Sequence, residues 1–204
     1  MSTRQEQREQ RREAILYAAL DLFAAKGYAA TKITDIADSL HISVGLLFHY
    51  FESKETLYEE LIGMGLEGAA YPAEQTYTHA IDFFNNFAGQ LFSYMQEQPY
   101  VAKFFVLMAD AQRNAGTPEH IRKIALRVDT IQQFVPLVEW GQKEGSIRAG
   151  EPLALSNAFW SSIQGIAENY AAHPETGLPR AEWIVDIVRA KKTADESTES
   201  GEKR

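Results

Sequence analysis

Apolar residues recur at the three- and four-residue spacing of an α-helix along most of the chain, and no run of residues alternates as a β-strand would. In the first such stretch Ile15, Ala19, Leu22 and Phe23 share one face, and Gly27 is placed to end the helix. Later helices, of roughly 15 to 28 residues, are expected to begin at proline-marked positions, namely Pro99, Thr117-Pro118-Glu119, Pro152 and Pro179. These patterns predict an all-α fold.

Composition excludes several classes of protein. The chain has 204 residues and no cysteine, so disulfide frameworks, cysteine-ligated zinc and thiol catalysis are ruled out. No apolar run approaches the roughly 18 residues of a membrane span, and the polar start MSTRQEQREQRRE has no apolar signal-peptide core. We therefore expect a cytoplasmic protein with no membrane partner.

The negative charge is unevenly distributed along the chain. The formal net charge is -8, but residues 1–55 hold seven Lys/Arg against eight Asp/Glu, a net of -1. The remaining residues hold thirteen against twenty, a net of -7. Because the acidity lies almost entirely in the later part, the first quarter of the chain is free to approach phosphates.

Residues 31–58, TKITDIADSLHISVGLLFHYFESKETLY, have the pattern of a helix-turn-helix. Thr34, followed by Asp35, is expected to start the first short helix, and Ser43 and Ser53 are expected to cap the next two. The expected inward positions are Ile36, Ala37, Leu40, Ile42, Leu47 and Phe51, with Leu57, Leu61 and Ile62 in the following helix.

The opposite face of the second short helix carries residues that a core does not need. Gly45, Leu46, Phe48 and His49 point outward when the helix is traced at 100° per residue. Contact with thymine methyl groups in a DNA major groove would explain an outward Leu and Phe. The other interpretation is a partly buried or simply tolerated surface, because isolated exposed apolar residues are common.

The segment ISVGLLFHYFESKETLY, preceded by TKITDIADSL and by a helix ending in FAAKGYAAT, resembles the N-terminal domain of the TetR family of transcriptional regulators. The similarity is close over residues 12–60, and residues 140–167 resemble the stretch that enters the family's dimerisation helices. The resemblance implies a DNA-binding domain over residues 1–55, a helical ligand-binding and dimerisation domain over 56–190, and a polar tail over 191–204, which we predict to be disordered.

The resemblance also implies which residues contact DNA. Thr31 and Thr34 would offer a hydroxyl and a backbone N–H to phosphate, and Lys54 would place its ammonium on a backbone phosphate. Alternatively, Thr34 is only a helix cap and Tyr50 is half core. The expected DNA-binding residues are Thr31, Thr34, Ser43, Val44, Gly45, Leu46, Phe48, His49, Tyr50 and Lys54.

The sequence departs from the family pattern at three places. Phe48 stands where the family usually has Tyr, Leu46 where it often has Thr, and His41 where the turn usually has Gly and a positive φ is expected. The helix over residues 44–50 has no Lys or Arg, so specificity is expected to depend on apolar contacts, His49 and DNA shape. An N-terminal arm with Arg4, Arg8, Arg11 and Arg12 could compensate at a minor groove or along phosphates, or could be a solvated helix extension.

Other motifs do not support an enzyme or a cofactor site. Residues 63–68, GMGLEG, match the dinucleotide fingerprint, but that motif works only between a strand and a helix. The glycines are expected to soften the fourth helix instead, as a hinge or by fraying. The five histidines lack metal-ligand spacing, and no catalytic motif is recognisable. We expect no cofactor, no metal and no enzymatic activity.

Aromatic residues concentrate in residues 71–108, where core packing is the ordinary explanation. Because the resemblance implies a ligand pocket, we expect an apolar or aromatic effector. The residues expected to line its pocket are Phe84, Phe87, Phe104, Phe105 and Met108. The last two helices have wide apolar stripes. The dimer interface is expected to include Phe159, Trp160, Ile163, Ile166, Trp183 and Ile187, although these residues could instead close the core of the monomer.

Together these features predict a homodimeric regulator, a repressor that binds a palindromic operator in double-stranded DNA and is released by a small molecule. The alternative is a helical ligand-binding or scaffold protein whose helix-turn-helix is degenerate and does not bind DNA.

Overall fold

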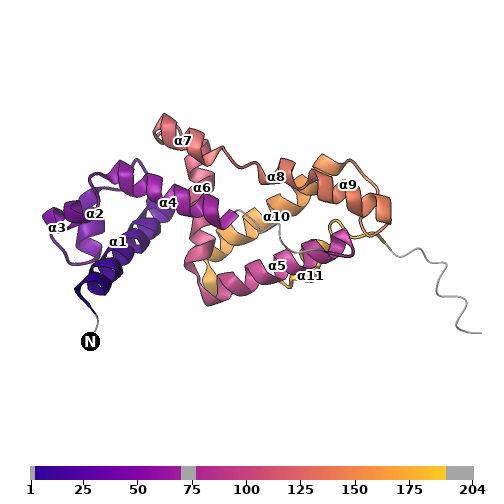
Figure 1. The fold of residues 1–204 in the computed structure, drawn as a ribbon, viewed down its shortest axis with the longest axis horizontal. Coiled ribbons are helices and arrows are strands. Elements are labelled where there is room, and N and C mark those ends of the chain that lie inside the picture. The colour runs from indigo at the N-terminus through magenta and orange to yellow at the C-terminus, as the bar shows by residue number, and fades with distance from the viewer. Residues whose placement is uncertain (1–2, 70–76, 192–204) are drawn as a thin grey trace, which may run out of the picture.

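The computed structural model describes residues 3–69 and 77–191. These residues form a succession of helices arranged around α6, which separates the helices at the N-terminal end from the rest (Figure 1). The bounds are α1 Arg4–Lys26, α2 Ile33–Ser39, α3 Val44–Tyr50, α4 Lys54–Ala69, α5 Ala80–Glu97, α6 Tyr100–Arg113, α7 Glu119–Ala125, α8 Thr130–Gln133, α9 Val135–Glu144, α10 Pro152–Ala172, a 3-10 turn Pro174–Thr176 and α11 Ala181–Val185. The all-α prediction is confirmed.

The N-terminal helices start where local hydrogen bonding allows. Ser43 caps α3 by accepting from the Leu46 N–H at 3.1 Å, and Ser53 caps α4 by accepting from the Thr56 N–H at 3.0 Å. The expectation for α2 was wrong by one residue, because the helix already begins at Ile33. Its first turn is closed by the Asp35 carboxylate, which accepts from the Lys32 N–H at 3.3 Å, so Thr34 is not the cap.

One buried core joins these helices to α6 and α7. Phe23, Leu47 and Tyr58 are among its buried members, together with Leu107 of α6 and Ile121 of α7. Of the predicted inward residues, Ile36, Ala37, Leu47, Phe51, Leu57, Leu61 and Ile62 are buried, whereas Leu40 and Ile42 are half-buried against the same core. The N-terminal helices therefore do not form a detached unit, since α6 and α7 complete their core.

Helix α4 continues through the GMGLEG segment, so these residues form neither a nucleotide loop nor a break. Gly65 lies against α6, where an added Cβ would be 2.8 Å from Met108 Sδ. Added Cβ atoms at Gly63 and Gly68 would meet nothing within 4 Å. The middle glycine thus allows α4 and α6 to approach closely, while the other two are left without a packing reason.

The C-terminal helices form a second core around α5, α9 and α10. Phe84, Phe134 and Phe159 are buried there, with Phe84 and Phe159 in edge-to-face contact at 4.9 Å between ring centroids. Val185 and Val188 near the C-terminus complete it. The core is therefore built largely from aromatic rings, as the aromatic density of the sequence suggested.

Two of the expected long helices are short. Helix α7 has seven residues and α11 only five. After Val185 the chain leaves helical geometry because it pairs with the segment after α9: the Arg148 N–H donates to Val188 O at 2.9 Å, and the Ala190 N–H donates to Ser146 O at 3.0 Å. The single strand-like pairing in residues 3–69 and 77–191, between Ile147 and Arg189, lies there.

Two further expectations concern the ends and the environment of the molecule. The predicted disordered tail, apart from Lys191, lies outside the described residues. Within the described part, no helix combines the length and the apolar character needed to cross a lipid bilayer.

Candidate DNA interface

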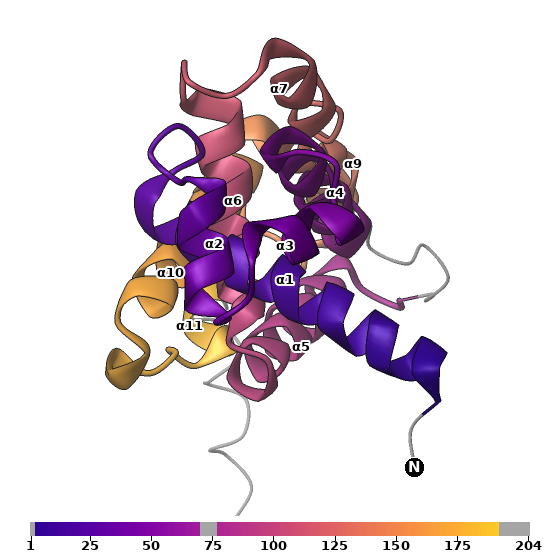
Figure 2. The same ribbon diagram turned by 90° about the vertical axis from the view of Figure 1, so that its left-hand side faces the viewer.

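Helix α3 is held from one side and open on the other. Leu47 and Phe51 are buried, and the Ser43 cap fixes the N-terminal turn. Gly45, Leu46, Phe48 and His49 are exposed, as predicted, with 39% of Leu46 and 46% of Phe48 accessible. Helix α3 lies at one extreme end of the molecule in Figure 1 and faces the viewer in Figure 2. The result is an apolar, uncharged ridge at an exposed tip.

The turn before α3 has the geometry expected from the sequence. His41 adopts φ 54°, the left-handed conformation that glycine adopts most readily. The turn closes where the Ile42 N–H donates to Ala37 O at 3.0 Å. Four residues, 40–43, separate the helices, because α2 ends at Ser39 and α3 begins at Val44.

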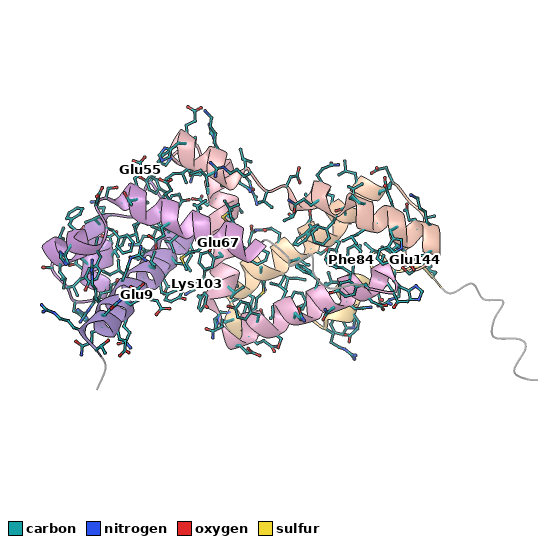
Figure 3. The ribbon with its side chains drawn as sticks, viewed as in Figure 1. Glu9, Glu55, Glu67, Phe84, Lys103 and Glu144 are labelled. Atoms are coloured by element: carbon teal, nitrogen blue, oxygen red, sulfur yellow. The ribbon has the colours of Figure 1, made fainter. Side chains whose placement is uncertain are left out.

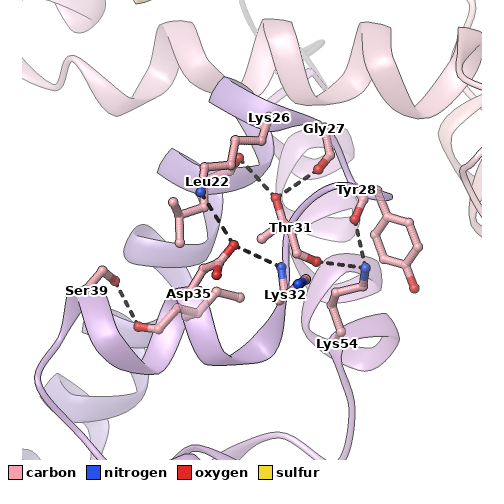
Figure 4. A network of polar contacts seen from close by, with 10 residues as sticks. Leu22, Lys26, Gly27, Tyr28, Thr31, Lys32, Asp35, Ser39 and Lys54 are labelled. Atoms are coloured by element: carbon pink, nitrogen blue, oxygen red, sulfur yellow. Dashed lines mark hydrogen bonds and ion pairs between the residues drawn. The ribbon is translucent and has the colours of Figure 1, made fainter.

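Figure 4 shows that Lys54 and Thr31 take part in a polar network inside the domain. The Lys54 ammonium donates to Tyr28 O at 2.8 Å and to Thr31 O at 2.9 Å, and it lies 4.1 Å from the centroid of the Tyr28 ring. Burial lowers the pKa of this ammonium. The Thr31 hydroxyl is buried and donates to Gly27 O at 2.8 Å and to Leu22 O at 3.2 Å.

These contacts correct the expectation for the Thr31 hydroxyl and add a structural role for Lys54. The Thr31 hydroxyl does not face solvent, because the α1–α2 loop uses it to satisfy its own carbonyl groups. Lys54 has a structural role that the sequence analysis did not assign, because it joins the start of α4 to that loop. Two of its three N–H groups are used there, so any phosphate contact would use the third.

The remaining predicted contact residues lie near α3 but differ in exposure. Thr34 is exposed at the start of α2, Val44 is half-buried, and Tyr50 is half-buried beside His49, with their ring centroids 5.5 Å apart. Direct DNA contacts by these residues remain predictions.

The sequence analysis missed two side chains that hold this domain together. Arg12 pairs with Glu60 of α4 at 2.6 Å, and its guanidinium lies 5.0 Å from the centroid of the Phe51 ring. Asp35 pairs with Lys26 of α1 at 3.4 Å besides capping α2. The partners are 48 and 9 residues apart, so only the presence of charged residues in both segments could have suggested the pairings.

Comparison with known proteins identifies the chain. Residues 15–61 match the family model described as bacterial regulatory proteins, tetR family. The transcriptional repressor KstR2 of Mycolicibacterium smegmatis is 27% identical over 160 residues, covering 76% of this chain and 78% of that protein. The crystal structure of the MbdR regulator from Azoarcus sp. CIB shares the fold, with a TM-score of 0.73 and 20% identity over 86% of this chain and 95% of that one.

Residues 15–61 belong to the TetR family.

A further relative and a further structure agree with this assignment. The transcriptional regulator HbdR of Aromatoleum sp. is 34% identical over 84 residues, which cover 36% of each protein. The crystal structure of PfmR, a TetR-family regulator from Thermus thermophilus, has a TM-score of 0.68 and 24% identity, covering 88% of this chain and 99% of that one. The family model and the two relatives point to a family of regulators.

The predicted ligand-lining residues of this TetR-family chain are not gathered around one cavity. Phe84 is fully buried in the C-terminal core, and Phe87 packs on the same core. Phe104 and Met108 pack instead on the N-terminal core. Phe105 packs both on the C-terminal core and on a smaller cluster formed by Phe92, Met95, Ala102 and Ala167. None of them lines the hollow between α10 and α11 or the hollow between α1 and α4.

The residues predicted to form the dimer interface differ in their burial. Phe159 and Ile163 are fully buried inside the monomer, which corrects their assignment to an interface between copies, and Trp160 is half-buried against Phe134. Trp183 is 62% exposed, and Ile187 is half-buried. Ile166 borders an open hollow of about 510 Å³ between α10 and α11, which also contains Ser161, Ser162, Gly165, Asn169, Gly177, Pro179 and Ile184.

Two histidines lie beside carboxylates. His79 Nδ1 lies 2.5 Å from Glu144, and His120 Nε2 lies 3.4 Å from Glu55 and 3.5 Å from Glu59. Across residues 3–69 and 77–191 no three His, Cys, Asp or Glu side chains form a group suited to a metal ion. The labelled Glu144 and Glu55 lie at opposite parts of the molecule in Figure 3.

Proposed function

We propose that this TetR-family protein is a ligand-responsive transcriptional repressor that binds a palindromic operator as a dimer and is released by a small molecule. The observation that carries the proposal is the exposed face of α3. Leu46 and Phe48 are open to solvent while Leu47, between them, is fully buried. A helix anchored in this way can enter a major groove without losing its attachment to the domain.

The chemistry of the ridge indicates how sequence would be read. Gly45 has no side chain, so the backbone in the first turn of α3 can approach the groove closely at this position. Leu46 and Phe48 offer apolar contact to thymine methyl groups, and His49 offers a hydrogen bond. Because α3 has no Lys or Arg, discrimination between sites is expected to depend strongly on DNA shape.

Effector control is proposed to act through α6, which packs against both ends of the molecule. On one side Lys103 pairs with Asp21 of α1 at 2.5 Å, and Met108 lies against Gly65 of α4. On the other side Gln164 of α10 donates to Phe105 O at 3.1 Å. A displacement of α6 would therefore reach the helices that carry α3, and a ligand that favours one position of α6 would change the affinity for DNA.

The effector is proposed to bind among the aromatic side chains of α5 and α10. Trp160 contacts Phe87 and Phe134, with ring centroids 5.1 and 4.7 Å apart. Its Nε1 is buried and has no hydrogen-bond partner among the described residues. A buried indole N–H favours an acceptor, so we expect an apolar or aromatic molecule that carries a carbonyl or carboxylate oxygen.

The dimer is proposed to form on the outer face of α10 together with α11. Ser161, Ser162 and Gly165 allow a second helix to approach closely, and Trp183 supplies exposed apolar area. A pair of α3 helices held in this way would meet two half-sites of an operator.

The proposal is tested by incubating the purified protein with a pool of random-sequence duplex DNA at near-physiological salt and sequencing the retained fraction. We expect a palindrome with half-sites about one helical turn apart, or a multiple of that distance. Retention of no preferred sequence would contradict the proposal and support the degenerate helix-turn-helix. That alternative is not favoured at present, because the relatives are named as repressors and regulators.

A further inference from the structure

The first turns of α1 carry charges that are sorted by sign around the helix. Arg4, Arg8 and Arg11 are spaced four and three residues apart, so they lie on one flank within about 60° of one another. The acidic residues of these turns, Glu6, Glu9 and Glu13, lie on the opposite flank. We call the first set the arginine row.

The arginine row continues the flank of α1 that faces the helix-turn-helix. The next positions at the same spacing are Ile15, which is buried in the N-terminal core, and Leu22, which packs against that core. Further along the same flank, Lys26 pairs with Asp35 of α2 at 3.4 Å. The row thus lies on the side of α1 from which α2 and α3 are built.

The position of the row agrees with this direction. The first turns of α1 project beyond the neighbouring helices at the same end of the molecule as α3, in both views (Figures 1 and 2). Helix α1 starts at Arg4 with a capping box, in which the Thr3 N–H donates to Glu6 Oε2 at 2.7 Å and the Glu6 N–H donates to Thr3 Oγ1 at 3.2 Å. The row is therefore carried on an ordered helix rather than on a loose arm.

The protein makes no structural use of these three arginines. All three are exposed, and none forms an ion pair with an acidic side chain of residues 3–69 or 77–191. Arg12 behaves differently, because it pairs with Glu60 and covers Phe51. The two arginines of the row that are four residues apart repel each other, and Arg4 lies at the positive end of the helix dipole. Residues of opposite charge three or four positions apart on each flank would stabilise α1 instead.

We propose that the arginine row binds the phosphate backbone of the same duplex that α3 enters. The proposal rests on the proposed function, because it places a second contact on that DNA. The row extends over about 10 Å of helix, and one strand presents a phosphate about every 3.4 Å along the duplex axis, so two or three phosphates are within its length. The row supplies the positive charge that α3 lacks, while the glutamate flank keeps phosphates away from the opposite side of α1.

The test compares the wild-type protein with the variant Arg4→Gln/Arg8→Gln/Arg11→Gln on a fluorescent duplex of about 40 base pairs and mixed sequence, over a series of salt concentrations. Loss of Z phosphate contacts makes the slope of log K against log salt shallower by about 0.9 for each contact. We expect the slope to become shallower by about 2 to 3 for each protomer. Glutamine favours helices about as well as arginine, so the circular dichroism of the variant should be unchanged.

The matched control is Arg4→Lys/Arg8→Lys/Arg11→Lys, which keeps the charges and should keep the wild-type slope. A wild-type protein that fails to bind the duplex at low salt would overturn the proposed function itself. Wild-type binding with an unchanged slope in the glutamine variant would overturn only the role of the arginine row. The role of the row in DNA binding would also be overturned if the glutamine variant kept the wild-type DNA slope but no longer sedimented with vesicles of phosphatidylserine and phosphatidylcholine. The partner of the row would then be an anionic membrane.

Discussion

At the scale of single residues, Lys54 shows how a residue that looks like a ligand contact can first be a structural one. Its ammonium bonds two carbonyl oxygens of the α1–α2 loop, Tyr28 O and Thr31 O. The loop in turn depends on the Thr31 hydroxyl, which is turned inward to Leu22 and Gly27. Removing the charge would therefore disturb the position of α2 relative to α4, and with it the support of α3.

We expect Lys54→Met to lower the free energy of unfolding by about 1 to 2 kcal/mol. Hydrogen bonds to a charged group contribute about 1.5 to 3 kcal/mol each when one partner is removed, and partial exposure of the side chain reduces that figure. The measurement is urea-induced unfolding followed by circular dichroism. Lys32→Met, an exposed site in the same domain, is the control and should change stability by less than about 0.5 kcal/mol. Equal stability of the two variants would refute a structural role for Lys54.

The residues of α3 could be predicted because their determinants are local. Ser43 has its partner three residues away, and Leu47 and Phe51 are a four-residue pair on one helix face. The roles of Lys54 and Thr31 could not be predicted, because their partners are main-chain carbonyl groups. Every residue has such a group, so no side-chain identity in the sequence marks Tyr28 or Thr31 as the acceptor.

At the scale of elements, the start of α5 depends on a side chain from the end of α9. Glu144 Oε1 accepts from the Ala80 N–H at 2.6 Å, and Oε2 lies 2.5 Å from His79 Nδ1. The hydrogen bond and the charge of Glu144 raise the pKa of His79. Desolvation of Glu144 acts in the opposite direction, but hydrogen bonds from Ser146, His79 and the Ala80 N–H together lower the pKa of its carboxyl group.

This arrangement predicts a pH-dependent contribution to stability. Because the pKa of His79 is raised in the folded protein, its stabilising effect is fully present below the unfolded value of 6.5 and is lost as pH rises through the higher folded value. Glu144 stays ionised throughout this range, because its pKa is lowered from 4.5.

We expect wild type to have a higher Tm than His79→Gln at about pH 6 and an equal Tm at about pH 9. The measurement is thermal unfolding of both proteins across this range. A difference in Tm that does not change with pH would show that the pair makes no ionic contribution.

Some features of the helices follow from neighbouring residues in the sequence, whereas others depend on residues far away in it. Helix α10 begins at Pro152, as the sequence predicted. Its inward face could not be chosen from the sequence, because apolar residues occupy more than one side of the helix. The structure buries Phe159 and Ile163 and leaves Gly165 exposed. Likewise α11 is short because residues 188–190 bond to the segment after α9, which is about 40 positions away in the sequence.

At the scale of the whole molecule, the proposed dimer would place the outer face of α10 between the two copies. Gly165 is exposed on this face, and an added Cβ there would meet nothing within 4 Å of the same chain. A large residue at this position would therefore leave the monomer intact and be felt only by a neighbouring copy.

We expect Gly165→Arg to convert a dimer into a monomer, measured by sedimentation velocity, without lowering the helical content. Because linked half-site contacts raise affinity by about 100-fold or more, binding to a selected palindrome should fall by at least that factor. Ser93→Lys, at an exposed position on α5, is the control and should remain dimeric. A dimeric Gly165→Arg protein would move the interface away from α10.

The uneven distribution of charge has a consequence for the approach to DNA. The part of the chain after residue 55 carries a net charge of -7, while the end that holds α3 and the arginine row is nearly neutral overall, with its arginines outermost. The electrostatic field of DNA would therefore rotate the protein so that its acidic end points away from the duplex and the α3 end points toward it. Encounters would then begin in nearly the binding orientation, and added salt would slow association by weakening that alignment.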